Sequence, residues 1–145
     1  MLPKPCGKVE FERVEFGYDP DARLFKDVNV AVEPGTMVAI VGPTGAGKTT
    51  FVNLLMRFYD PQRGRILVDG MDIRNMSRDE LHGVLGMVLQ DTWLFNGSIA
   101  ENIAYGKPNA SREEIERAAK AARIDHFIKT LPRGYDTVVD DELLP

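Results

Sequence analysis

The first third of the chain has the hydrophobic pattern of a small antiparallel sheet. Apolar residues alternate with polar ones across 9–16, with one shift of phase in the middle, and again across 28–32 up to a turn at Pro34-Gly35. Alternation with a period of two is typical of strands that bury one face. Between the two segments, Gly17–Asp21 is rich in turn-forming residues. We therefore predict two antiparallel strands joined by this turn.

The pattern changes at Met37–Val41, where five apolar residues follow one another without alternation. Such a run is typical of a strand covered on both faces, as in a parallel sheet. Val84–Leu89, interrupted by one glycine, has the same character. Between them, Lys48–Tyr59 is apolar on nearly every side, which predicts a buried helix. A short strand is predicted at Ile66–Val68.

Three segments begin with the sequence Ser-x-x-Glu, in which the serine hydroxyl caps a helix and the glutamate bonds back to the serine amide. The pairs are Ser77 and Glu80, Ser98 and Glu101, and Ser111 and Glu114. The later helices are predicted at 112–122 and 124–131. Antiparallel strands, a strand–loop–helix unit and then helices together indicate an α/β fold with a helical extension.

Composition limits the class of protein further. The 145 residues carry a net charge of −4 and are 43% hydrophobic, which fits one globular domain or part of one and excludes a wholly disordered chain. Mild acidity argues against binding to DNA or to an anionic membrane surface. One cysteine, Cys6, excludes an internal disulfide and fits a reducing compartment. Neither a membrane-spanning run nor a signal peptide is expected, so we expect the chain alone to be soluble.

Gly42–Thr49 has the full pattern G-x-x-x-x-G-K-[ST] of a phosphate-binding loop, placed between a predicted strand and a predicted helix. Glycines let backbone amides approach a polyphosphate, and the following helix turns its positive end toward it. Lys48 then reaches the β- and γ-phosphates, and the Thr49 hydroxyl ligates a bridging Mg²⁺. The alternative is a glycine-rich turn with a capping threonine. The residues predicted to bind nucleotide in this segment are Pro43, Thr44, Gly45, Ala46, Gly47, Lys48, Thr49 and Thr50.

Several further segments, taken in order with this loop, resemble the nucleotide-binding domain of an ATP-binding-cassette (ABC) transporter of the exporter type, similar to multidrug and lipid exporters. The matching segments are Val14–Tyr18, Val41–Thr50, Arg57–Pro61, Gly64–Gly70, Val88–Phe95, Glu101–Ile103 and Leu131–Thr137. The resemblance implies a P-loop NTPase core of the ABC type, with an antiparallel β subdomain, a strand–loop–helix unit and the start of a helical subdomain. It divides the chain into a leader at 1–8, a partial nucleotide-binding domain at 9–139 and an acidic end at 140–145.

The resemblance also implies roles by position. It makes Tyr18 the aromatic side chain that stacks on adenine, and Gln90 the glutamine that contacts Mg²⁺ or the attacking water. Lys48 and Gln90 would then act in catalysis, and Thr49 and Gln90 would hold the metal. From the residues alone, local packing at a strand end explains Tyr18 better, and Gln90 is a polar strand end.

The partners follow from the same resemblance. Gln90–Phe95 would dock the transmembrane domain of the same transporter, although its aromatic residues are otherwise typical of plugs under a loop. A second nucleotide-binding domain would pair head-to-tail across ATP at the cytoplasmic face of the cell membrane, and no nucleic acid is expected. In the full protein, ATP binding and hydrolysis would power export. His82 and His126 lack metal-binding spacing and are interpreted as surface or helix-end residues.

The family's later motifs are absent from these 145 residues: the signature sequence, the Walker B strand with its catalytic glutamate, and the switch histidine. Val138–Glu142 contains an Asp-Glu pair, but its apolar run is too short for a central strand, so we interpret it as an acidic linker. Without the later strands, an apolar sheet edge would stay open. We therefore expect the chain to bind Mg·ATP without hydrolysing it at a useful rate.

Three alternatives stay open. The chain could be a catalytically inactive ATP-binding or interaction module, an ABC-type ATPase of DNA repair or translation rather than transport, or a P-loop kinase or GTPase. Tyr18 before the loop and 90–92 after it argue against the last of these, as does the lack of a guanine-reading motif. The exporter-like match and the aromatic segment argue against the second.

Overall fold

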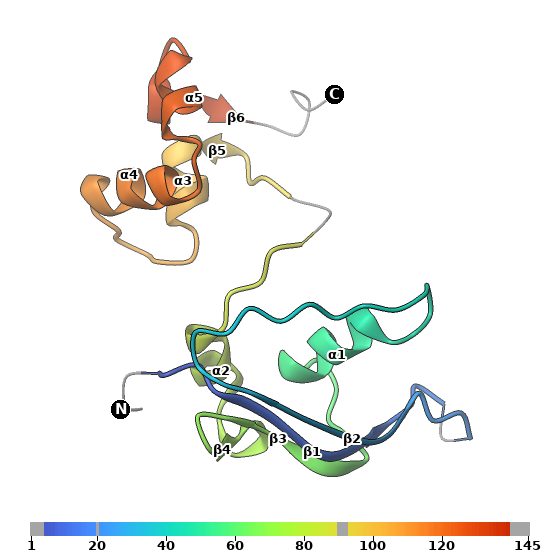
Figure 1. The fold of residues 1–145 in the computed structure, drawn as a ribbon. Coiled ribbons are helices and arrows are strands. Elements are labelled where there is room, and N and C mark those ends of the chain that lie inside the picture. The colour runs from blue at the N-terminus through green and yellow to red at the C-terminus, as the bar shows by residue number, and fades with distance from the viewer. Residues whose placement is uncertain (1–4, 20, 90–92, 140–145) are drawn as a thin grey trace. The chain divides into compact units, whose positions relative to one another are not determined.

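The computed structural model describes residues 5–19, 21–89 and 93–139. The chain forms two compact units, Met1–Met87 and Val88–Pro145. Each unit has its own hydrophobic core, and Figure 1 shows the helices and strands of each. No helix among the described residues is long and apolar enough to cross a membrane.

The first unit is built on an antiparallel sheet of four strands. They are β1 (Val9–Phe16), β2 (Phe25–Val32), β3 (Arg63–Val68) and β4 (Met71–Asp72), in the order β2-β1-β3-β4. Every pair of neighbours is antiparallel. The antiparallel sheet predicted for the first third of the chain is confirmed, and β3 confirms the short strand predicted at 66–68.

The shift of phase in β1 is a β-bulge. Pairing with β2 shifts register between Phe11 and Val14, and Arg13 has a left-handed φ of 49°. The bulge turns both Phe11 and Val14 into the core, where they are 2% and 0% exposed. On the neighbouring strand, Gly64 has φ 76°, and a Cβ there would overlap the Arg13 carbonyl oxygen. A glycine is therefore required where β3 passes the bulge.

Helix α1 (Lys48–Leu55) packs against the sheet. The Phe51 ring stacks on Phe11 with 4.0 Å between centroids, and Leu54 is fully buried. The turn η1 (Ile73–Asn75) and the short helix α2 (Arg78–Val84) complete this unit. The buried residues of its core are Phe11, Val14, Phe16, Leu54, Ile66, Val68, Ile73, Met76 and Leu81.

Helix α1 ends four residues earlier than the predicted Tyr59. Arg57 takes a left-handed φ of 54°, and its guanidinium donates to the carbonyl oxygens of Ile73 at 2.9 Å and Met76 at 2.7 Å. These bonds turn the chain away from the helix axis, so Phe58 and Tyr59 are half exposed rather than buried.

The two predicted buried strands differ from the structure. Met37–Val41 and the residues after Val84 are irregular; apart from Leu85, which packs against the core, they are exposed, with Met37 98% and Val88 97% accessible. A strand forms only where another strand accepts its backbone hydrogen bonds. Among the described residues, neither segment pairs with a strand, which explains why the apolar runs alone do not fold as predicted.

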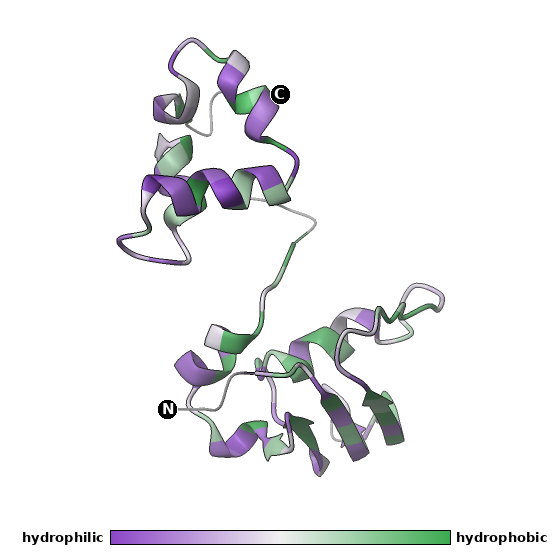
Figure 2. Ribbon diagram, turned by 60° about the vertical axis from the view of Figure 1, so that its left-hand side comes forward, coloured by the Kyte–Doolittle hydropathy of each residue, from purple (hydrophilic) through white to green (hydrophobic). Residues whose placement is uncertain are grey.

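The second unit is mostly helical. It contains α3 (Ile99–Ala104), α4 (Arg112–Ala121), α5 (Asp125–Thr130) and the turn η2 (Gly134–Asp136). A two-stranded ribbon joins β5 (Gly97–Ser98) to β6 (Val138–Val139). The core consists of Ile115, Ala119, Ile128 and Tyr135, and Figure 2 shows the rest of α4 coloured mainly as hydrophilic.

The three predicted capping boxes are all present. In each, the serine hydroxyl accepts the backbone N–H of the glutamate, and the glutamate side chain accepts the backbone N–H of the serine. The helices predicted at 112–122 and 124–131 are confirmed to within one residue at each end. This unit agrees with the predicted start of a helical subdomain.

Candidate functional site

The glycine-rich loop before α1 is shaped by left-handed glycines. Gly45 has φ 85°, and Gly47, which caps α1, has φ 90°. A Cβ on Gly47 would lie 2.7 Å from Cε1 of Phe25, so only glycine fits there without displacement. Gly47 supplies no side-chain cap, and the first turn of α1 holds no acidic residue. The amides that open the helix are thus left available to an anion.

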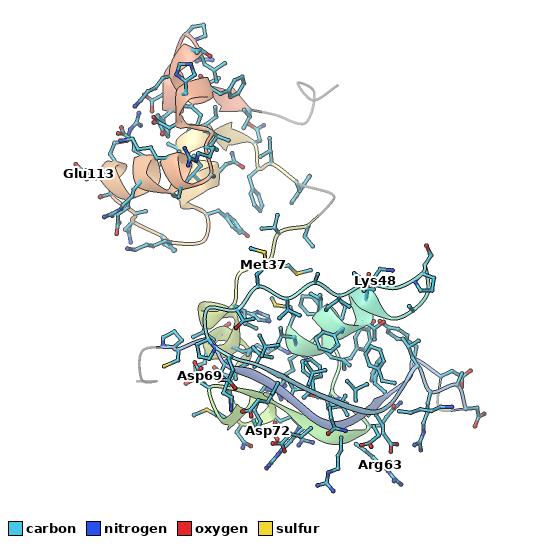
Figure 3. The ribbon with its side chains drawn as sticks, in the orientation of Figure 1. Met37, Lys48, Arg63, Asp69, Asp72 and Glu113 are labelled. Carbon is cyan, nitrogen blue, oxygen red and sulfur yellow. The ribbon has the colours of Figure 1, made fainter. Side chains whose placement is uncertain are left out.

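Lys48 is folded back over this loop. Its Nζ donates to the carbonyl oxygens of Gly42 and Pro43, each at 2.8 Å. Figure 3 shows Lys48 at the start of α1 and Met37 on the segment that leads into the loop. An ammonium has three donors, so one remains for another acceptor. The lysine is therefore held as a positive charge at the mouth of the loop.

Tyr18 lies just after the end of β1, in the turn that leads to β2. Its ring meets Phe16 and Tyr59 edge to face, with 5.1 Å between centroids in both cases. Its hydroxyl is hydrogen-bonded to Oγ1 of Thr50, at 3.1 Å. The tyrosine is nevertheless 57% exposed, so part of its ring is free for contact with a ligand.

One cleft joins Tyr18 to the glycine-rich loop. Its volume is about 540 Å³. The residues that line it are Tyr18, Asp19, Ala22, Leu24, Thr44, Gly45, Gly47, Lys48, Thr49 and Thr50. Two parts of the chain about 30 residues apart thus face one space, large enough for a small organic ligand.

Most of the residues predicted to bind nucleotide line this cleft. Pro43 and Ala46 do not, although both shape the loop: the Pro43 carbonyl accepts from Lys48 and from the Ala46 amide. Sequence reasoning missed Asp19, Ala22 and Leu24. Their only signal was membership of the turn region that follows the predicted aromatic residue. Gln90 lies outside the described residues.

The two threonines that open α1 have different environments. Thr50 is 5% exposed and bonded to Tyr18, whereas the Thr49 side chain is exposed at the cleft. A single hydroxyl fits Mg²⁺, which usually takes one or two protein oxygens and completes its shell with phosphate and water. No group of three or more acidic, histidine or cysteine side chains in the described ranges could hold a metal by itself. The donor set therefore suits a metal that arrives with a phosphate ligand.

The second unit presents an aromatic cluster on the predicted docking segment. Trp93 is 71% exposed and lies 5.1 Å from the Phe95 ring, which stacks on Tyr105 at 4.2 Å. Asn102 bonds both backbone polar groups of Phe95. The first three residues of the predicted segment, 90–92, lie outside the described residues.

His82 and His126 are exposed residues of α2 and α5, and Nε2 of His82 bonds the Met56 carbonyl. The interpretation of both as surface histidines is confirmed.

Val138–Val139 forms β6 and pairs with β5, so this part of the proposed acidic linker is a strand. Strand β5 is the partner that makes this pairing possible, and two valines in a row do not predict such a partner from the sequence.

Comparison with known proteins decides the family. The family model described as "ABC transporter" matches residues 25–139. The chain belongs to the ABC transporter family. This result confirms the predicted resemblance, and the ABC fold accounts for both the antiparallel subdomain and the phosphate-binding loop.

Two ABC proteins and one solved ABC structure show which kind of ABC transporter the chain is similar to. The chain is 58% identical over 141 residues to the fatty acid ABC transporter ATP-binding/permease protein of Mycobacterium tuberculosis, covering 97% of this chain and 22% of the relative. It is 52% identical over 133 residues to the ATM1-type heavy metal exporter of Novosphingobium aromaticivorans, covering 92% and 22%. The structure of a bacterial Atm1-family ABC exporter with ATP bound matches with a TM-score of 0.86 and 50% identity, over 96% of this chain and 24% of that one.

The chain is thus an ATP-binding region of the ABC exporter type. It spans about a fifth of the length of the curated relatives it matches.

Proposed function

We propose that the cleft of the first unit binds Mg·ATP, with the adenine on Tyr18 and the phosphates over the loop that ends at Lys48. The observation that carries this proposal is the shared cleft, because an exposed aromatic ring and a phosphate-binding loop face the same space. A planar ring holds a base through stacking, and the loop amides and Lys48 supply positive charge for the phosphates.

The residues of the loop would have different roles in binding the phosphates. The Lys48 ammonium, now bonded to two loop carbonyls, would exchange one or both bonds for phosphate oxygens, which carry more charge. The exposed Thr49 hydroxyl would ligate Mg²⁺, and the metal would neutralise charge on the β- and γ-phosphates. Gln90 is proposed as the further contact to the metal or the attacking water.

We further propose that these 145 residues bind nucleotide without turning it over. Asp19 is the acidic residue that lines the cleft, and its carboxylate already accepts the Asp21 amide at 2.9 Å. Hydrolysis needs a group that positions and deprotonates water, and no second carboxylate reaches the cleft among the described residues. In the full transporter, by contrast, ATP binding and hydrolysis would drive export.

The partners of the full protein are part of this proposal. The exposed aromatic cluster around Trp93 supports Gln90–Phe95 as the contact with the transmembrane domain of the same transporter. A second nucleotide-binding domain would close over the same ATP in a head-to-tail dimer. Both partners place the domain at the cytoplasmic face of a membrane.

Calorimetric titration of the chain with Mg·ATP tests the proposal. We expect saturable binding in the wild type and its loss in Lys48→Ala. Lys120→Ala, which removes an exposed lysine from α4 in the other unit, is the matched control and should leave affinity unchanged. Equal affinity in Lys48→Ala and wild type would contradict the site, and Lys48-dependent release of phosphate would contradict binding without turnover.

A further inference from the structure

One side chain holds the backbone of the residue that precedes Tyr18. Oε1 of Gln62 accepts the Gly17 N–H at 2.9 Å, and Nε2 of Gln62 donates to the Gly17 carbonyl at 2.8 Å. Both backbone polar groups of Gly17 are thereby satisfied by a single amide 45 residues away. This is the pairing that a neighbouring strand would otherwise provide.

The bonds between the Gln62 side chain and Gly17 extend the pairing of β1 beyond its last backbone hydrogen bond to the Gln62 segment. The Gln62 N–H donates to the Glu15 carbonyl at 2.9 Å, just before β3 begins. Strands β1 and β3 pair as far as Glu15 and Arg63, and the Gln62 amide continues the pairing to Gly17. The end of β1 is therefore anchored one residue further than the strands themselves reach.

Gly17 is confined from its other side as well. A Cβ on Gly17 would overlap the Ala22 carbonyl oxygen, so the returning chain passes directly against this backbone. The Leu24 N–H also donates to the Phe16 carbonyl, at 2.9 Å. With Gln62 on one side and the Ala22 segment on the other, the backbone that leads into Tyr18 has little freedom.

The segment that carries Gln62 also supports the ring of Tyr18. Tyr59, three residues earlier, meets that ring edge to face at 5.1 Å. The turn between α1 and β3 thus contributes two contacts to the aromatic residue, one to its ring and one to the backbone before it. No residue of this turn lines the cleft itself.

We propose that Gln62 is a positioning residue for the Tyr18 platform and that it sets affinity for the base of the nucleotide rather than for its phosphates. This inference rests on the proposed binding of ATP at the cleft. Loss of the Gln62 amide would free the turn, so that ordering Tyr18 on binding would cost conformational entropy that the wild type has already lost on folding. The Gln62 amide is bonded to Gly17 rather than to Lys48 or the loop carbonyls, so we expect the phosphate contacts to be kept.

The test compares Mg·ATP with Mg·tripolyphosphate, which carries the phosphates but no base. We expect Gln62→Ala to weaken ATP binding about tenfold, as the loss of two hydrogen bonds predicts, and to leave the tripolyphosphate Kd unchanged. Lys48→Ala is the contrasting variant and should weaken both ligands. Gln62→Asn keeps the amide on a stem too short to reach both Gly17 groups, and should give the same base-selective loss with less effect on folding.

The outcomes separate this inference from the proposed function. Retention of the wild-type preference for ATP over tripolyphosphate in folded Gln62→Asn would overturn the positioning role alone. An equal loss for both ligands would do the same, since it would mean a general structural effect. Equal Kd values for ATP and tripolyphosphate in the wild type would instead contradict the adenine platform, and with it the proposed function.

Discussion

Asn102 holds Phe95 by both of its backbone polar groups. Oδ1 of Asn102 accepts the Phe95 N–H at 2.8 Å, and Nδ2 donates to the Phe95 carbonyl at 2.9 Å and to the Ser98 carbonyl at 3.0 Å. Gln62 bonds both backbone polar groups of Gly17 in the same way in the other unit. In both places a side-chain amide fixes the backbone beside an exposed aromatic residue, Tyr18 in one unit and Trp93 in the other.

The Asn102 contact predicts the order of the aromatic segment. Asn102→Ala should free the chain around Phe95 and cost about 1–3 kcal/mol of stability in the second unit. Trp93 is the one tryptophan of the chain, so its fluorescence reports on this segment directly. We expect greater quenching by acrylamide and lower anisotropy in the variant. Asn53→Ala, on α1 in the other unit, is the control. A similar change in Trp93 quenching and anisotropy in that variant would mean that Asn102 does not specifically order the segment.

Substitution by alanine should lower the free energy of unfolding by different amounts at two glycines of the loop. Gly45 and Gly47 both have left-handed φ values, but a Cβ on Gly45 meets open space whereas one on Gly47 meets Phe25. Gly45→Ala should cost about 1 kcal/mol from backbone strain alone, and Gly47→Ala about 1–3 kcal/mol more from the clash. Urea midpoints measure both. Equal midpoints would mean that Phe25 yields freely and that packing does not select glycine at 47.

Tyr135 and Asp125 predict how the second unit responds to pH. The Tyr135 hydroxyl donates to Oδ1 of Asp125 at 2.8 Å, and Lys129 donates to the other carboxylate oxygen at 3.0 Å. Burial, and then the bond to Asp125, raise the pKa of Tyr135 from 10.0 to about 12. The bond to Lys129, and then that to Tyr135, lower the pKa of Asp125 below 3.8.

The directions of these two pKa shifts determine the pH range over which Tyr135 and Asp125 stabilise the fold. Tyr135 stabilises the fold below pH 10, and this contribution is lost as pH rises toward about 12; that of Asp125 is present above pH 3.8 and is lost as pH falls below it. Spectrophotometric titration of tyrosinate should show one of the four tyrosines ionising near 12, and this step should vanish in Tyr135→Phe. A step that persists in the variant would assign the raised pKa to another tyrosine.

Local features were the ones that the sequence predicted well. The phase shift in 9–16, the three capping boxes and the loop that opens α1 depend on residues within a few positions of one another. Met37–Val41 failed as a strand because a strand also needs a partner, and the hydrophobic pattern carries no information about which segment supplies it.

The candidate site was predictable only in part for the same reason. Lys48 and Thr49 followed from the loop pattern, whereas Tyr18 entered through its resemblance to a family, since nothing in the spacing connects it to a loop about 30 residues away. Gln62 gave no signal, and Asn102 lay in a segment of the family resemblance but was given no role of its own. A side-chain amide in a turn, as in Gln62, or on a short helix, as in Asn102, looks like a solvent-exposed group until the backbone groups that it bonds are in place.

Tyr18 itself offers the clearest separation of ring from hydroxyl. Tyr18→Phe keeps the ring and its contacts with Phe16 and Tyr59 but removes the bond to Thr50. Base stacking on an aromatic ring contributes about 1–3 kcal/mol, so Tyr18→Ala should weaken Mg·ATP binding by roughly 5- to 150-fold. Tyr18→Phe should stay within about threefold of wild type, because one hydrogen bond away from the ligand is lost and the stacking face is kept. Titration of both variants with Mg·ATP measures this, and a loss in Tyr18→Phe as large as that in Tyr18→Ala would mean that the hydroxyl bonded to Thr50, rather than the ring, determines the affinity of the cleft.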